Sequence, residues 1–159
     1  MSDLTHLDAE GRARMVDVGA KPVTARRASA VGTITMNAEA LSAVENNALA
    51  KGDALATARV AGIMAAKKTP ELIPLCHPIA LEDVGVDFEI DRALPGIRVT
   101  AWAAARSRTG VEMEALAAAS VALLTIYDMT KSLDRGMEIS GLRVTAKSGG
   151  KTEIRPAAG

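Results

Sequence analysis

The sequence predicts an α+β fold in which a four-stranded antiparallel sheet carries its helices on one face. The clearest sign is segment 84–91, where apolar and polar residues alternate with the period of a half-buried strand. Pro95 and Gly96 then mark a turn, and 97–105 is the expected hairpin partner. A long alanine-rich helical pattern follows the hairpin, and the chain then returns to a strand pattern.

The first half of the chain supplies one strand and two helices. β-Branched residues in 26–36 predict the first strand. Asn37 is placed to cap a short helix over 38–48. Asp53 is placed to cap a second helix over 54–68, which the proline two residues later ends.

The second half begins with segment 69–80, whose three prolines predict an irregular connection with little helix. Thr109 and Glu112 have capping-box spacing, and the helix that they begin runs to about Ser132. Its predicted apolar stripe consists of Met113, Leu116, Ala117, Leu123, Leu124 and Tyr127. A last strand is expected over 137–147. The resulting β-α-β-β-α-β order, with one extra short helix, is that of a ferredoxin-like sandwich.

We expect residues 1–159 to form a single domain, with a flexible arm at 1–25 and a flexible tail at 148–159. Helices on one face leave the other face of the sheet bare unless another subunit covers it. Trp102 has the polar-side phase of its strand, which suggests burial by such a partner.

Charge and aromatic content argue against nucleic-acid binding. Lys plus Arg balance Asp plus Glu at 19 each, so the chain has no global field that would attract a polyanion or a membrane surface. The only aromatic residues are Phe88, Trp102 and Tyr127. Three scattered aromatic residues do not provide the stacking platforms of an RNA-binding sheet.

The same sequence points to the cytoplasm. Its single cysteine, Cys76, excludes an intrachain disulfide and suits a reducing compartment. The first twenty residues lack the apolar block of a signal peptide. The alanine-rich run 115–126 is too short to span a membrane.

Asp128 and Lys131 are three positions apart near the end of a predicted helix, so they share a face. Spacing alone favours a solvated surface pair, worth about 0.2–0.5 kcal/mol. The alternative is a carboxylate that takes part in proton transfer, beside an ammonium group that binds phosphate or keeps the carboxylate ionised.

His77 and Cys76 lie together in the proline-rich connection, where either a structural or a functional role is open. Cys76 follows an apolar residue and has no evident base, which favours a structural thiol over a nucleophile. Met113 and Glu114 fit a core methionine and an acid in the first helical turn, respectively. No histidine or cysteine cluster has metal-ligand spacing.

Five basic residues are scattered along the chain, and each alone is an ordinary surface residue. If the fold brings them together, they could hold a triphosphate. The sequence has no glycine-rich phosphate loop, so phosphate binding would depend on side chains and exposed backbone amides. These residues are Arg26, Lys51, Lys67, Lys131 and Lys147.

Several strings, in one order along residues 4–151, resemble the cyclic pyranopterin monophosphate synthase family of molybdenum-cofactor biosynthesis. They are LTHLD, MVDV, TPELIPLCHP, GVEMEAL, LTIYDMTKS and KSGGK. The resemblance implies a ferredoxin-like enzyme that converts cyclised dihydro-GTP to a pterin with a cyclic phosphate and releases pyrophosphate. It implies no resident cofactor, although magnesium accompanying the triphosphate stays open. It also implies a hexamer, a trimer of dimers, with active sites between subunits.

The resemblance further implies roles for individual residues. Asp128 takes the position of the active-site acid, and Lys131 and Lys51 are the cationic helpers that we expect for it. Substrate contacts are implied for Leu75, Cys76, His77, Met113, Glu114, Lys67, Arg26 and Lys147. Thr130 departs from the cysteine of many relatives but lies outside these positions.

Helix geometry adds a constraint on that site. Met113 and Asp128 are fifteen positions apart, which is roughly 22 Å along an α-helix. A single nucleotide would not touch both ends, so we expect two subunits to contribute. The alternative to an enzyme is a non-catalytic ferredoxin-like module that binds a nucleotide as a regulator, which the fold alone would permit.

Overall fold

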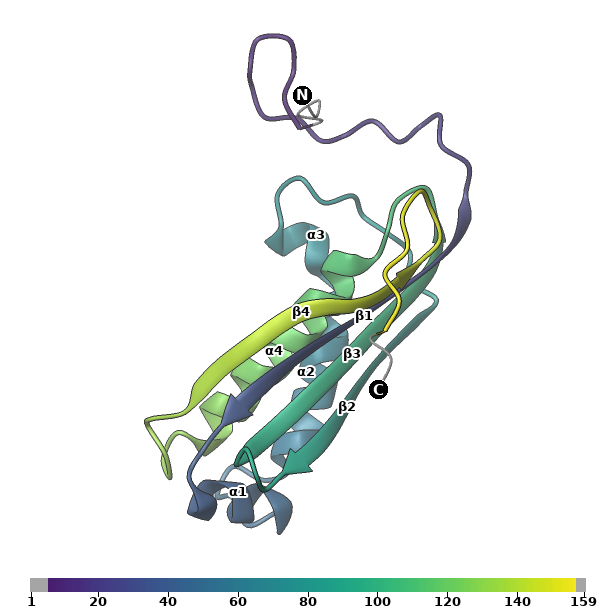
Figure 1. The fold of residues 1–159 in the computed structure, drawn as a ribbon. Coiled ribbons are helices and arrows are strands. Elements are labelled where there is room, and N and C mark those ends of the chain that lie inside the picture. Colours follow the sequence, from purple (N-terminus) through teal and green to yellow (C-terminus); the bar gives the residue numbers. More distant parts are fainter. Residues whose placement is uncertain (1–5, 157–159) are drawn as a thin grey trace.

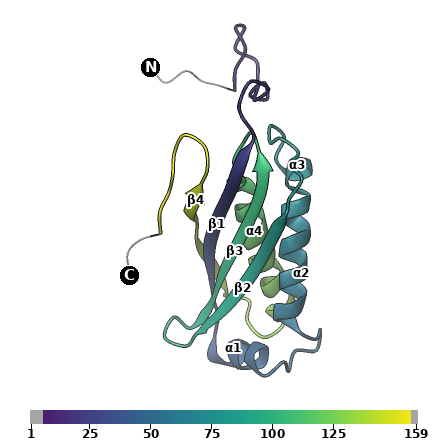
Figure 2. The same cartoon turned by 90° about the vertical axis from the view of Figure 1, so that its right-hand side faces the viewer.

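The structure is a computed structural model that describes residues 6–156. It contains four strands and four helices (Figures 1 and 2). In chain order these are β1 (Thr24–Thr35), α1 (Ala38–Glu45), α2 (Ala54–Lys67), α3 (Thr69–Leu72), β2 (Asp83–Asp91), β3 (Gly96–Ser107), α4 (Glu112–Thr130) and β4 (Glu138–Ser148).

The strands form one antiparallel sheet in the order β2-β3-β1-β4. Helices α2 and α4 cover one face of this sheet, and α1 lies at its lower end (Figure 2). The predicted α+β, ferredoxin-like fold class is therefore confirmed. The core between the layers is built largely from small residues, including Ala28, Ala30, Ala101, Ala103, Ala115, Ala118, Ala119 and Ala122.

Both predicted N-caps at the start of the fold are confirmed. The side chain of Asn37 accepts the amide of Ala40 at 2.8 Å, at the start of α1. Asp53 accepts the amide of Ala56 at 2.9 Å, at the start of α2. Each cap satisfies one of the amide groups that a helix start leaves without a partner.

Two predictions about α4 are wrong. Its N-cap is Val111 with no side-chain cap bond, and Glu112 pairs with Lys147 of β4 instead of closing a capping box with Thr109. The predicted stripe is wrong in part, because Met113 and Leu124 are exposed, whereas Leu123 is buried and Leu116 and Tyr127 pack against the core. Helix α4 packs against both the sheet and α2, so its buried surface is broader and consists mainly of alanine.

The connection after α2 is more ordered than its prolines predict. Residues Thr69–Leu72 form the short helix α3 with Pro70 in its first turn, where the missing amide of proline costs nothing. Thr69 is buried and donates its hydroxyl to the carbonyl of Ala66 at 2.9 Å. The segment 69–80 thus contains one short turn of helix, and it is irregular after Leu72, as predicted.

Helices α2 and α4 approach closely at Gly62. A Cβ atom added there would lie 2.8 Å from the carbonyl oxygen of Ala118 and 2.9 Å from a methyl group of Val86. Only glycine therefore fits at this crossing without displacing a neighbour. The close contact sets the position of α2 relative to both α4 and the sheet.

The open face of the sheet carries Trp102, which is half-buried against its own chain. Its indole lies over Gly85 of the neighbouring strand, where an added Cβ atom would come within 1.9 Å of the ring. The indole nitrogen donates to Asp83 at 3.0 Å, and Asp83 also pairs with Arg27 at 3.3 Å. Burial of Trp102 by a partner stays a prediction.

The predicted arm and tail extend in part beyond the described residues. In the described part of the arm, the backbone of Leu7 pairs with that of Ala13, and the segment before β1 projects past the end of the sheet (Figure 1). Ile154 pairs with Lys147 through two backbone hydrogen bonds. The flexibility of both ends stays a prediction.

Helix α4 is long and apolar enough to cross a membrane by length and composition alone. In the fold it packs against α2 and the inner face of the sheet, with Ala118, Ala122 and Ile126 buried. These contacts are those of a core helix.

Candidate active site

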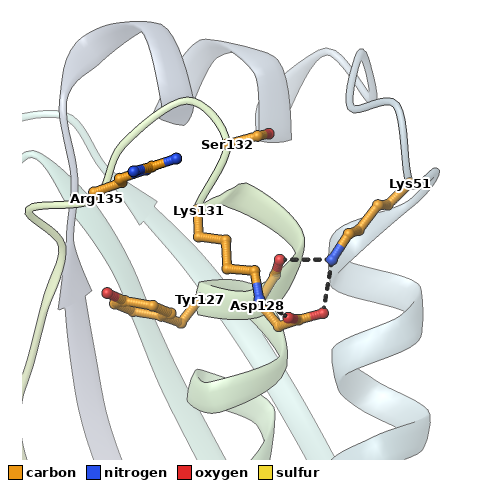
Figure 3. Close-up of a pocket in the computed structure, with 6 residues that line it drawn as sticks. All are labelled: Lys51, Tyr127, Asp128, Lys131, Ser132 and Arg135. Carbon is orange, nitrogen blue, oxygen red and sulfur yellow. Dashed lines mark hydrogen bonds and ion pairs between the residues drawn. The ribbon is translucent and has the colours of Figure 1, made fainter.

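A cavity of about 500 Å³ opens beside the C-terminal end of α4 (Figure 3). Helix α4 contributes its last turn, the loop before α2 contributes one lysine, and the loop after α4 contributes the rest. The lining residues are Lys51, Tyr127, Asp128, Lys131, Ser132 and Arg135.

Asp128 is held between two lysines in this cavity. Lys51 Nζ donates to Oδ2 of Asp128 at 2.9 Å and to its backbone carbonyl, also at 2.9 Å. Lys131 Nζ lies 2.7 Å from Oδ1. Hydrogen bonds from Lys131 and then from Lys51 lower the pKa of Asp128 to about 2. The side chain is nonetheless 56% exposed, so the ionised carboxylate and both ammonium groups are open to a ligand.

Lys51 reaches this site because of the turn that joins α1 to α2. Gly52 has φ of 92°, a conformation that suits glycine, and Asp53 then caps α2. Lys51 therefore lies just before α2, while Asp128 and Lys131 lie at the end of α4. The antiparallel packing of the two helices brings these positions together.

A second group of predicted residues lies at the other end of α4. A cavity of about 570 Å³ opens there, lined in part by Lys21, Leu75, Cys76, His77, Glu112 and Met113. The connection after α3 supplies the first wall and the start of α4 supplies the second. The structure therefore brings Leu75, Cys76, His77 and Met113 together, as the resemblance implies.

Glu114 lies next to this second cavity but points into the protein, with only 1% of its surface exposed. Its Oε1 atom accepts a long hydrogen bond from the Cys76 thiol at 3.9 Å. Oε2 has no hydrogen-bond partner within residues 6–156. Burial, and to a lesser degree the nearby charge of Glu112, raise the pKa of Glu114. Burial also raises the pKa of Cys76, so its thiol holds its proton and is a poor nucleophile.

Two basic residues flank the same end of the fold. Lys147 of β4 forms a half-buried ion pair with Glu112. Arg26 of β1 donates to the backbone carbonyls of Ser107 at 3.3 Å and Arg108 at 3.4 Å. Lys67 lines a separate hollow of about 460 Å³ between the end of α2 and residues 79–84. Four predicted site residues therefore line neither of the first two cavities: Arg26, Lys67, Glu114 and Lys147.

The predicted site residues thus fall at two ends of one helix. Glu114 and Asp128 are fourteen positions apart on α4, which is roughly 21 Å along its axis. The structure therefore does not bring the two ends together within one chain. This separation agrees with the sequence argument from helix length.

Sequence reasoning missed three residues of the first cavity: Tyr127, Ser132 and Arg135. Asp128, Lys131 and Arg135 are spaced by three and then four positions, which is helical spacing and was the available signal. The helix ends at Thr130, so Arg135 reaches the cavity from a loop instead. Within residues 6–156, no group of three His, Cys, Asp or Glu side chains is arranged to hold a metal ion.

A ferredoxin-like sheet with an ionised acid between two lysines in an open cavity is typical of an enzyme that acts on an anionic small molecule. Comparison with known proteins identifies the family to which this enzyme-like site belongs. Residues 15–150 match the MoaC family, and the chain belongs to this family.

Relatives of this chain have the name cyclic pyranopterin monophosphate synthase, among them the three that follow. The relative from Methylobacterium nodulans is 59% identical over 157 residues, covering 99% of this chain and 98% of its own. The relative from Novosphingobium aromaticivorans is 58% identical over 158 residues, covering 99% of both chains. The relative from Brucella ovis is 58% identical over 149 residues, covering 94% of this chain and 90% of its own.

Proposed function

We propose that this chain converts cyclised dihydro-GTP to cyclic pyranopterin monophosphate and releases pyrophosphate. It is an enzyme of molybdenum cofactor biosynthesis with the cyclic pyranopterin monophosphate synthase activity named for its relatives. The observation that supports the mechanism best is the ionised Asp128, held between Lys51 and Lys131 in an open cavity. We propose the cytoplasm as its compartment.

Closing the cyclic phosphate requires a sugar hydroxyl to attack the α-phosphorus. The hydroxyl proton passes to a base, the new O–P bond forms, and the bond from the α-phosphorus to the bridging oxygen breaks. Pyrophosphate leaves with that electron pair. Lys51 and Lys131 are placed to stabilise the charge of the phosphates.

Asp128 is the proposed general acid or base. With both lysines bound to it, its pKa of about 2 makes it a weak base. A polyphosphate that draws Lys51 and Lys131 toward itself removes the two interactions that lower the pKa of Asp128. Substrate binding would therefore shift Asp128 toward the range where it can accept a proton. Because a bound anion and Asp128 compete for the same two lysines, anion binding changes the pKa of Asp128.

The residues at the other end of α4 are proposed to hold the substrate. Leu75 and Met113 supply apolar contacts, and His77 is placed to orient the base or a phosphate. Glu114 and Cys76 lie beside them, joined by a long hydrogen bond from the thiol, and burial raises the pKa of both groups. Arg26, Lys147 and Lys67 are the proposed cations of this part of the site.

One substrate can meet both sets of residues if a second copy of the chain supplies one of them. We propose that the active site joins the Asp128 end of one α4 to the Glu114 end of another, and that the assembly is a hexamer built as a trimer of dimers. Exposed apolar side chains on α2 and α4 support such self-association: Val60, Met64 and Leu124.

The direct test is to incubate the purified protein with cyclised dihydro-GTP. The expected products are pyrophosphate and a pterin that becomes fluorescent after oxidation. Asp128→Asn serves as the matched inactive control, because it keeps the shape of the side chain without its charge. Tight substrate binding without product from the wild-type protein would support the regulatory-module alternative instead.

A further inference from the structure

Arg135 is a third cation in the cavity beside Asp128. It is exposed and forms no ion pair with any side chain within residues 6–156. Figure 3 shows its side chain extending from the loop after α4 toward Lys131 and Ser132. Lys51 and Lys131 already have Asp128 as a partner, so Arg135 is the cation of this cavity that Asp128 does not engage.

The charge of the cavity favours an extended anion. Lys51, Lys131 and Arg135 carry positive charge, and Asp128 carries the opposing negative charge. Figure 3 shows Lys51 and Arg135 on opposite sides of Lys131. An anion with several charged groups along its length can contact all three cations. A single phosphate cannot be shared among them as readily.

The loop that carries Arg135 is held on both sides of it. Asp134 Oδ2 accepts the backbone amide of Asn37 at 2.7 Å, which joins the loop to the start of α1. Asp134 Oδ1 accepts the amide of Gly136, also at 2.7 Å. The Asn37 side chain donates to the carbonyl of Leu133 at 3.2 Å. The backbone of Arg135 is thus positioned before any ligand binds, which reduces the ordering cost of binding.

We propose that Arg135 binds the pyrophosphate portion of the substrate and of the departing product. This inference rests on the proposed function, since it assigns a role within that reaction. A guanidinium group presents a planar fork of donors that matches two phosphate oxygens, and it keeps its charge at every relevant pH. When the bond to the α-phosphorus breaks, negative charge grows on the pyrophosphate, and Arg135 stabilises that charge. Lys51 and Lys131 serve the reacting end beside Asp128.

The test uses inorganic pyrophosphate alone as the probe, in magnesium-free buffer, with isothermal titration calorimetry. Arg135→Gln is expected to weaken pyrophosphate binding about tenfold or more, a loss that corresponds to one charge-assisted contact. Arg135→Lys is expected to recover part of the affinity. Arg92→Gln is the matched control, because Arg92 is an exposed arginine that lies outside the cavity and pairs with Glu45.

Turnover gives a second, independent measurement. Arg135→Gln is expected to lower kcat, because the leaving group carries more negative charge in the transition state than in the bound substrate, and to raise the pyrophosphate concentration needed for product inhibition. If instead Arg135 stacks on the pterin ring, Arg135→Gln would raise KM with unchanged pyrophosphate affinity. That result would overturn the proposal, as would wild-type pyrophosphate affinity in a folded Arg135→Gln protein.

The two proposals fail in different ways. A wild-type protein that makes no product, yet binds pyrophosphate in a manner dependent on Arg135, would retain the anion site and refute the proposed reaction. A wild-type protein that makes product, while Arg135→Gln keeps its kcat and pyrophosphate affinity, would retain the reaction and refute the role of Arg135. Circular dichroism and the thermal midpoint establish that each variant is folded.

Discussion

Lys51 Nζ donates to both the backbone carbonyl and the carboxylate of Asp128, at 2.9 Å in each case. The first of these contacts does not depend on the Asp128 side chain. Lys51 therefore keeps a partner when the carboxylate is removed. The charge of Asp128 can be changed without freeing the loop that carries Lys51.

The first prediction follows for Asp128→Asn and Asp128→Ala. Both should fold with thermal midpoints within about 2 °C of the wild type, since the side chain is exposed. Both should lose pyrophosphate release by about 10²–10⁴-fold if Asp128 transfers a proton. Asp87→Asn is the control, because Asp87 is also an exposed acid in an ion pair, with Arg59. Near-normal turnover in a folded Asp128 variant would remove this residue from the mechanism.

The second prediction concerns stability and pH at Glu114. Burial raises its pKa above 4.5, so the folded protein keeps this proton at pH values where the unfolded chain has lost it. The folded state then binds more protons, and stability falls as pH rises from about 4.5 through the folded pKa. Glu114→Gln removes this titration. The thermal midpoint of the wild type should therefore drop relative to the variant over that range.

Thermal melts from pH 4 to pH 8 provide the measurement, and Glu89→Gln on the sheet surface controls for the loss of a carboxyl group. Toward pH 4 the difference between the wild-type and Glu114→Gln midpoints should level off, because the unfolded chain also takes up this proton. A difference that stays constant up to pH 8 would contradict the raised pKa of Glu114.

The third prediction tests the site shared between two chains. Inactive Glu114→Ala and Asp128→Ala proteins are mixed under conditions that exchange subunits. Random pairing makes about half the dimers mixed, each with one intact site, so about a quarter of all sites should recover. In the reciprocal experiment, excess double mutant should abolish wild-type activity. No recovery, with exchange verified by mass spectrometry, would place both residues in the site of one chain.

The fourth prediction concerns Gly85, whose Cα lies under the Trp102 ring. Gly85→Ala should displace the indole, break its hydrogen bond to Asp83 and destabilise the protein by about 1–3 kcal/mol. Trp102 is the only tryptophan, so its fluorescence emission should shift with the mutation. Gly136→Ala controls for replacing a glycine at the surface, because an added Cβ atom there would lie 3.4 Å from its nearest neighbour, an ordinary van der Waals contact. Unchanged emission in Gly85→Ala would contradict the packing of the ring.

The sequence predicted the order of the elements because their signals are local. Strand alternation at 84–91 and the caps Asn37 and Asp53 involve residues within a few positions of one another. The capping box failed because Glu112 interacts with Lys147, a partner 35 positions away on another strand. Local spacing does not reveal such a competing partner.

The site was predicted in part for the same reason. The Asp128–Lys131 pair is a contact within one helix, and the separation of the two ends of α4 follows from helix length. Lys51 and Arg135 reach the cavity through tertiary contacts, by the packing of α2 on α4 and by the loop that Asp134 joins to α1. The spacing of Arg135 from Lys131 was a signal in the sequence, but the loop after Thr130 and its bond to Asn37 decide where Arg135 lies.

The close packing of α2 on α4 at Gly62 affects the geometry of the Lys51–Asp128 pair. Lys51 lies just before α2 and Asp128 lies in the last turn of α4, so the spacing of these two helices sets the distance between the ammonium group and the carboxylate. Any larger residue at position 62 would push α2 away from α4 and change that distance. Mutational tolerance at this buried glycine is thus coupled to the acidity of a surface carboxylate, although the two share no contact.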